Sequence, residues 1–231
     1  MIEAGEKGKY AIVLALYDNE KEPIKYQRVA LDSRFKNARN VVFLMEAYQK
    51  NIKRDLDTKG FASLGIKPVA ATDAELLGSY VGTEKCKSCH EESHRVWRKS
   101  GHAKAWQSLV ETSVPSRTYD PECISCHVVG WNPQEMYPYI GGFSNEKGKV
   151  TDHLTNVGCE SCHGPGEYHC DAEIGANEDL QDKLRAAIRL PLDATPKLCY
   201  TCHDLDNSPE FDFSTYWPKI EHKELIRLED E

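Results

Sequence analysis

The first quarter of the chain shows two kinds of hydrophobic pattern. Residues 9–32 contain two runs of β-branched and aromatic side chains around a polar turn, which predicts a β-hairpin. Apolar residues then recur at spacings of three and four from Val41 to Ile52, a pattern that predicts a helix over about residues 38–55. We therefore expect residues 1–57 to form a small β-β-α segment, which contains neither cysteine nor histidine.

The rest of the chain has few long periodic segments. Residues 58–79 hold Gly, Ala, Ser and Pro in no regular order, which indicates a linker. Beyond it, short helices are predicted around residues 103–110 and 179–190. The apolar fraction, with Gly counted in place of Tyr, is about 42%, a little under the usual 45–50%. We expect residues 80–231 to form a mainly α domain with extensive loops, in which cofactors supply part of the core.

Four Cys-x-x-Cys-His motifs lie in this second region and use eight of the nine cysteines. Two thiols two residues apart reach the two vinyl groups of one haem, while the adjoining histidine binds the iron. Zinc or iron–sulfur sites built from Cys-x-x-Cys pairs do not explain why a histidine follows all four pairs. We predict four haem c groups. The attachment cysteines are Cys86, Cys89, Cys123, Cys126, Cys159, Cys162, Cys199 and Cys202, and the proximal iron ligands are His90, His127, His163 and His203.

The sequence segments around these motifs resemble those of a known family. Residues 80–109 read YVGTEKCKSCHEESHRVWRKSGHAKAWQSL, and CISCHVVGW at Cys123 and HLTNVGCESCHGPG at His153 follow. In this order they resemble the cytochrome c-554 family, tetrahaem proteins that take electrons from hydroxylamine oxidoreductase in ammonia oxidisers. The likeness covers about residues 80–222. It implies a multihaem cytochrome c fold around closely packed haem pairs, with distal histidines from elsewhere in the chain.

Five histidines lie outside the motifs, and four irons await a distal ligand. The resemblance implies a distal role for three of them. His102 would bind the haem at His203, His169 the haem at His90, and His222 the haem at His163. Of the methionines, which raise the potential of a haem as ligands, only Met136 lies in the haem region. We therefore expect bis-His haems of low potential.

The family leaves the haem at His127 five-coordinate, but this chain has a histidine that the best-known member lacks. His153 stands six residues before Cys159, and histidine at this spacing ahead of a C-E-S-C-H motif is a distal ligand in other multihaem cytochromes. We predict that His153 binds this haem. His94 has no predicted role, and the odd cysteine, Cys170, is interpreted as a free buried thiol or as part of an intermolecular disulfide.

The N-terminal words GKYAIVLAL and VALD resemble the closing strands of a metallophosphoesterase catalytic domain, although the metal-ligand motifs of that family do not occur in this chain. Thioether attachment takes place outside the cytoplasm, and residues near Met1 show no export leader. We therefore expect the reading frame to continue upstream into an exported protein that works in the periplasm or outside the cell.

The formal net charge of −8 disfavours nucleic acid as a partner. The leading interpretation is an electron carrier that exchanges electrons with redox partner proteins and transforms no small-molecule substrate. A multihaem reductase or oxidase of a small nitrogen compound is the first alternative, and it requires one haem with an open position. A subunit that self-assembles into a conductive filament is the second alternative.

Overall fold

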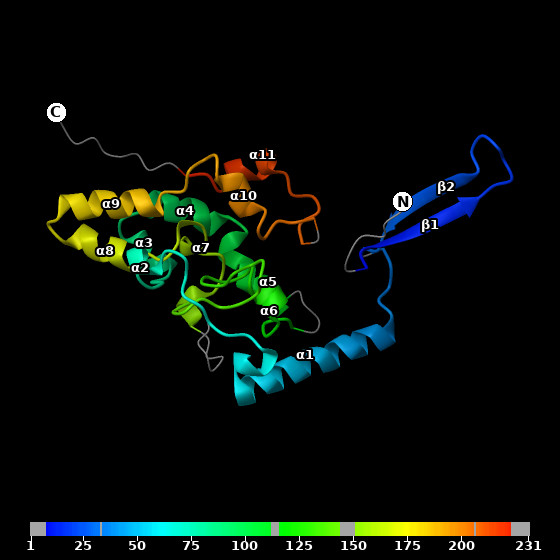
Figure 1. The fold of residues 1–231 in the computed structure, drawn as a ribbon, viewed down its shortest axis with the longest axis horizontal. Coiled ribbons are helices and arrows are strands. Elements are labelled where there is room, and N and C mark those ends of the chain that lie inside the picture. Colours follow the sequence, from blue (N-terminus) through cyan, green and yellow to red (C-terminus); the bar gives the residue numbers. More distant parts are fainter. Residues whose placement is uncertain (1–7, 33, 112–115, 144–150, 206, 223–231) are drawn as a thin grey trace.

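The predicted hairpin is present at the N-terminal end (Figure 1). Strands β1 (Tyr10–Leu16) and β2 (Ile24–Ala30) are antiparallel, with Tyr10 opposite Ala30 and Leu16 opposite Ile24. The structure is a computed structural model. It describes residues 8–32, 34–111, 116–143, 151–205 and 207–222.

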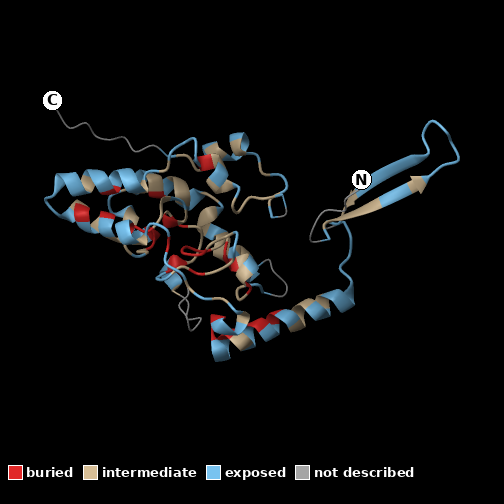
Figure 2. Ribbon diagram, viewed as in Figure 1, coloured by how far each residue is buried: buried red, intermediate tan, exposed pale blue. Residues whose placement is uncertain are grey.

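The hairpin buries none of its side chains fully, and Figure 2 shows it coloured as exposed or intermediate throughout. Leu16 is 78% exposed and Tyr26 is 70% exposed. An isolated two-stranded hairpin is marginally stable in water, because it has no third layer to cover an apolar face. The apolar faces of β1 and β2 are therefore available for packing against another protein surface.

Helix α1 (Arg39–Lys59) joins the hairpin to the helical body. Its buried residues are Gln49, Ile52 and Leu56, so only its C-terminal half packs on the body. The helix is longer than predicted by about one turn, because Leu56 continues the apolar stripe. It ends at Gly60, whose φ of 66° is a conformation that glycine adopts without strain.

The remaining described elements are short helices connected by loops, as the sequence predicted. They are η1 (Phe61–Leu64), α2 (Ala74–Leu77), α3 (Thr83–Lys87), α4 (Glu91–Lys99), η2 (His102–Lys104), α5 (Ala105–Glu111), α6 (Pro121–Ile124), η3 (Asp152–Leu154), α7 (Glu160–His163), α8 (Glu167–Ile174), α9 (Glu178–Ile188), α10 (Thr195–Cys199), α11 (Phe213–Tyr216) and η4 (Trp217–Lys219). The segment predicted to be a linker contains η1 and α2, and its residues Phe61 and Leu77 are buried. No helix in the described ranges is long and apolar enough to cross a membrane.

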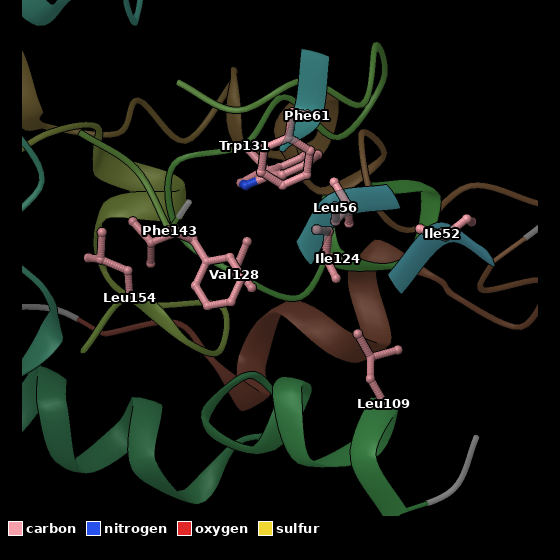
Figure 3. Packing of buried hydrophobic residues seen from close by; sticks show 10 residues of the cluster. Ile52, Leu56, Phe61, Leu109, Ile124, Val128, Trp131, Phe143 and Leu154 are labelled. Atoms are coloured by element: carbon pink, nitrogen blue, oxygen red, sulfur yellow. The ribbon is translucent and has the colours of Figure 1, made fainter. Parts of the chain in front are cut away.

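The main apolar cluster joins α1 to the region of the second motif (Figure 3). It consists of Ile52, Leu56, Phe61, Leu109, Ile124, Val128, Val129, Trp131, Phe143 and Leu154. The rings of Phe61 and Trp131 meet edge to face with centroids 5.2 Å apart. A smaller cluster of Leu77, Ala172 and Leu184 ties α2, α8 and α9 together. The two clusters hold the short helices in place around the motif residues.

Candidate haem-binding site

All four motifs open onto one cavity. Every one of their eight cysteines and four histidines lines it, and its volume is about 3080 Å³. Pockets for a drug-sized ligand hold roughly 300–1,000 Å³, so this cavity has room for several large cofactors. Thiols in pairs with one imidazole each are the donor set of haem c, and the residues present fit that group. We number the sites 1 to 4 by their motifs in chain order.

Each motif is shaped by a single helical turn. At sites 1, 3 and 4 the histidine amide donates to the carbonyl of the first cysteine, for example His90 N to Cys86 O at 2.9 Å and His203 N to Cys199 O at 2.9 Å. At site 2 the His127 amide donates instead to Ile124 O at 2.9 Å, a tighter turn. These turns bring the two thiols and the imidazole of one motif close together, as attachment of one porphyrin requires.

Three pairs of imidazoles face each other inside the cavity, and they are the three pairs implied by the family resemblance. The ring centroids are 6.1 Å apart for His90 and His169, 6.0 Å for His102 and His203, and 5.9 Å for His163 and His222. A metal bound to an imidazole nitrogen at about 2 Å on each side would separate the ring centres by about 6 Å. The spacing of each pair thus suits one iron between the two rings.

The structure does not bring His153 and His127 together. His153 is exposed, does not line the cavity, and has its ring against Gly82, where an added Cβ would lie 2.7 Å from His153 Cδ2. Its backbone is nevertheless near site 2, because Leu154 O accepts a 2.9 Å hydrogen bond from Val129 N. Among the described ring contacts none joins His153 to His127. Ligation of site 2 by His153 stays a prediction and requires its ring to turn.

The Nδ1 atoms of the proximal histidines have different partners. His127 Nδ1 lies 2.6 Å from Ala105 O, and His163 Nδ1 lies 2.8 Å from Ile188 O. If Nε2 binds an iron, each Nδ1–H would donate to the carbonyl and thereby fix the tautomer and the ring orientation. His203 Nδ1 instead lies 2.9 Å from the hydroxyl oxygen of Ser208.

His169 has a carboxylate beside its outer nitrogen. The residue is 9% exposed, and its Nδ1 is buried without a hydrogen-bond partner in the described structure. The nearest acidic oxygen, Glu173 Oε1, is 3.6 Å away. Arg185 holds this carboxylate with Nε–Oε1 and Nη2–Oε2 hydrogen bonds of 2.8 and 2.7 Å and thereby lowers the pKa of Glu173. The carboxylate is therefore ionised at neutral pH.

Contacts between cysteines of different motifs place the four sites in a row. The thiols of Cys86 and Cys159 are in hydrogen-bonding contact, which joins sites 1 and 3. The thiols of Cys202 and Cys126 make the same contact between sites 4 and 2. Cys199 raises the pKa of Cys162, and Cys162 raises the pKa of Cys202. These thiols therefore lie near one another, which makes sites 3 and 4 neighbours. The spatial order is thus site 1, site 3, site 4, site 2.

Glu160, inside the third motif, is a structural residue that the sequence analysis missed. It is 4% exposed, and its carboxylate accepts three backbone hydrogen bonds, from Val81 N at 2.9 Å, Gly82 N at 2.7 Å and Gly166 N at 2.9 Å. Burial raises the pKa of Glu160, and the three N–H groups oppose that effect. The carboxylate thereby ties site 3 to the segment directly before site 1. The sequence signal for this role was the presence of a charged residue, Glu160, between the two cysteines of the third motif.

His94 and Cys170, the two unassigned residues, have ordinary surroundings. His94 is buried, with Nε2 3.3 Å from Glu84 Oε1 and its ring 5.2 Å from that of Trp97, and it does not line the cavity. Cys170 is half-buried, lines the cavity, and has a pKa raised by burial. His94 therefore fits a packed, paired side chain, and Cys170 a free thiol within this chain.

Known proteins resemble the middle of the chain. Residues 85–164 match the family model of cytochrome c554 and c-prime. Cytochrome c-554 of Nitrosomonas europaea is 38% identical over 99 residues, which cover 38% of this chain and 39% of that protein. The chain thus matches about two fifths of the relative's length. The solved structure of the reduced state of cytochrome c554 from Nitrosomonas europaea covers 54% of this chain and 65% of that chain, with 26% identity and a TM-score of 0.38.

Proposed function

We propose that the chain is a tetrahaem c-type cytochrome that transfers electrons between redox partner proteins, because residues 85–164 match the family model of cytochrome c554 and c-prime. The observation that carries this proposal is the set of three imidazole pairs, each about 6 Å apart, in one cavity that all four motifs line. Haem iron supplies the one-electron chemistry, and the protein sets ligation, spacing and surroundings. We place the protein in the periplasm or outside the cell.

The row of sites supports transfer from one haem to the next. Cysteines of sites 1 and 3 and of sites 4 and 2 are in contact, and those of sites 3 and 4 lie near each other, so the porphyrins that they hold would be adjacent along the order 1, 3, 4, 2. Haems held at these sites would exchange single electrons with their neighbours, and partner proteins would supply and remove the electron at the ends. Facing imidazoles, as in the pair His90 and His169, would hold each such iron from both sides and limit its rearrangement.

Haem content tests the proposal directly. We expect the mass of the purified, haem-loaded chain to exceed the polypeptide mass by four haems, and the alkaline pyridine spectrum to show thioether-linked haem. Replacing Cys199 and Cys202 together with alanine should reduce the count to three, since both attachment points of site 4 are lost. Cys170→Ala is the matched control and should retain four. Fewer than four haems in the unaltered protein would contradict the proposal.

The position of His153 favours a second function, redox chemistry on a small nitrogen compound at site 2. With His153 exposed and outside the cavity, an iron held by His127 would lack this second imidazole, and an open position is what a substrate needs. If His153 does turn to bind, as we predict, all four haems are low-spin and site 2 carries electrons only.

Electron paramagnetic resonance of the oxidised protein separates the two functions. With His153 as ligand, we expect four low-spin ferric signals, one of which changes in His153→Met while His94→Met, the control, changes none. A high-spin signal in the unaltered protein that persists in His153→Met would refute this ligation and favour chemistry at site 2.

The exposed hairpin favours an assembled form, the remaining alternative for this chain. Its apolar side chains, such as Leu16 and Tyr26, have no cover within the described residues, and stacked subunits would bury them. Electron microscopy of the purified protein should then show filaments or discrete oligomers. Monomers under all conditions would count against assembly.

A further inference from the structure

The outer nitrogens of the ligand imidazoles face acceptors of three different strengths. At site 1 the acceptor nearest to His169 Nδ1 is the Glu173 carboxylate. At site 3 it is a backbone carbonyl for both His163 and His222, at 2.8 and 2.9 Å. At site 4 the hydrogen-bonding partner of the proximal His203 Nδ1 is a hydroxyl, that of Ser208, and the Asp204 carboxylate acts on the same ring through its charge. Sites 1, 3 and 4 follow one another in the row, so the acceptor weakens along these three sites, while site 2 again has a backbone carbonyl, that of Ala105, at His127.

A stronger acceptor on Nδ1–H makes the imidazole a better electron donor to the metal. A better donor stabilises the ferric iron relative to the ferrous iron and so lowers the reduction potential. Hydrogen bonding beyond the axial ligands is one of the levers by which proteins tune haem potential. An anionic carboxylate accepts more strongly than a carbonyl, and a hydrogen bond to a charged group is roughly twice as strong as a neutral one.

Glu173 is placed to act on His169 once that ring binds iron. Its 3.6 Å distance from Nδ1 is longer than a hydrogen bond, and an approach of roughly half an ångström would form one. The buried Nδ1 has no other partner in the described structure, so Glu173 is the acceptor within reach. One helical turn separates the two residues in α8, and the two hydrogen bonds from Arg185 on α9 fix the carboxylate.

Site 4 has the opposite surroundings. Ser208 Oγ is a neutral acceptor for His203 Nδ1, and the imidazole stacks on Phe211 with centroids 4.3 Å apart and an interplanar angle of 11°. An apolar ring on one face of the ligand offers no compensating acceptor. Asp204 acts on His203 without a hydrogen bond to its Nδ1, and the hydroxyl is a weaker acceptor than the carbonyl at His163, which favours a higher potential than at site 3.

We propose that Glu173 is a positioning residue that makes site 1 the haem of lowest potential, and that the potentials rise from site 1 through site 3 to site 4. The inference rests on the bis-His ligation proposed above. Electrons then enter from a reducing partner protein near Cys86 and run towards His203. The different acceptors would thus set the direction of electron flow along the row of sites. The positions of the sites alone do not set it.

The test is a redox titration of the haem-loaded protein followed by electron paramagnetic resonance, in which each bis-His haem has its own low-spin signal. The signal that His169→Met alters identifies site 1. We expect Glu173→Gln to raise the equilibrium constant for reduction of this haem about tenfold, equivalent to 59 mV for one electron. Arg185→Gln should shift it in the opposite direction, because the carboxylate loses its counter-charge.

Asp182→Asn is the matched control. Asp182 also binds Arg185, at 3.3 Å, but its side chain is 79% exposed, so the variant removes an equal charge without touching the ligand. Opposite shifts for Glu173→Gln and Arg185→Gln, with Asp182→Asn unchanged, support the inference. The inference is overturned if no potential shifts, or if the shifts have the same sign, as a general structural change would give. Four intact low-spin haems in those variants would still leave the proposed function standing. Absence of low-spin signals in the unaltered protein would overturn both.

Discussion

Replacing Glu160 with alanine is expected to prevent stable folding of the haem-loaded protein. The change leaves the amides of Val81, Gly82 and Gly166 buried without their acceptor. Each orphaned buried group costs about 1–3 kcal/mol, and the whole of a protein's stability is about 5–15 kcal/mol. Denaturant unfolding of the full chain, monitored by haem absorption, should show a loss of several kcal/mol or no cooperative transition.

Two variants separate the buried carboxylate from a general loss of a glutamate. Glu160→Gln keeps the shape and one acceptor oxygen, so we expect a smaller loss of about 1–3 kcal/mol, from the one amide that then faces an NH₂ group. Glu167→Ala is the control, because Glu167 accepts one exposed backbone hydrogen bond, from Ser79 N at 2.8 Å. It should cost about 1 kcal/mol or less. Equal losses for Glu160→Ala and Glu167→Ala would contradict the role given to Glu160.

The grouping of each pair of cysteines with its histidine could be predicted from the sequence because the Cys-x-x-Cys-His spacing is local. Two thiols and an imidazole must meet one porphyrin, and a spacing of two residues followed by histidine is enough to place them on a single turn, as at Cys86 and His90. Pairing of distal histidines depends on tertiary structure, which no local pattern contains. The three imidazole pairs came from the family resemblance and not from spacing.

The residues that surround the ligands were not predicted, because their roles depend on contacts between distant segments. Glu160 binds amides 78 and 79 positions earlier in the chain, and Glu173 is fixed by Arg185, 12 positions later. A weaker signal did exist at Glu173, which follows His169 by four residues and so lies on the same helical face. Spacing alone cannot tell this arrangement from a solvent-exposed pair.

The sequence predicts that His153 serves site 2, whereas the structure has its side chain outside the cavity. The word HLTNVGCESCH places a histidine near the third motif, and the bridge between Val128 and Thr155 does bring that segment beside site 2. The direction of the side chain is set by η3: adjacent positions of a helix do not face the same way, so with Leu154 buried in the main cluster its neighbour His153 points to solvent. Sequence spacing predicts proximity of the backbone but not the direction of the side chain.

Alanine at Gly142 is expected to disrupt the loop that supports site 2. An added Cβ would lie 2.2 Å from Gly130 O and 2.9 Å from Gly130 Cα, so the clash is with backbone and no side chain can turn away to relieve it. Gly130 follows the second motif by three residues, and its carbonyl accepts a 2.9 Å hydrogen bond from Tyr139 N. Overpacking typically costs about 1–3 kcal/mol, and a backbone clash should exceed that range.

Two other glycines, Gly141 and Gly101, serve as controls for this prediction. Gly141 has a φ of 78° but only Ser79 side-chain atoms, at 3.8 and 3.9 Å, near the added Cβ, so Gly141→Ala should cost about 1–2 kcal/mol from backbone strain alone. Gly101 has nothing within 4 Å and no positive φ, and Gly101→Ala should change the free energy of unfolding by less than about 1 kcal/mol. Unfolding of the three haem-loaded variants should rank Gly142→Ala as the least stable, with the spectrum of site 2 altered first. A Gly142→Ala protein as stable as Gly101→Ala would show that this close approach does not support the site.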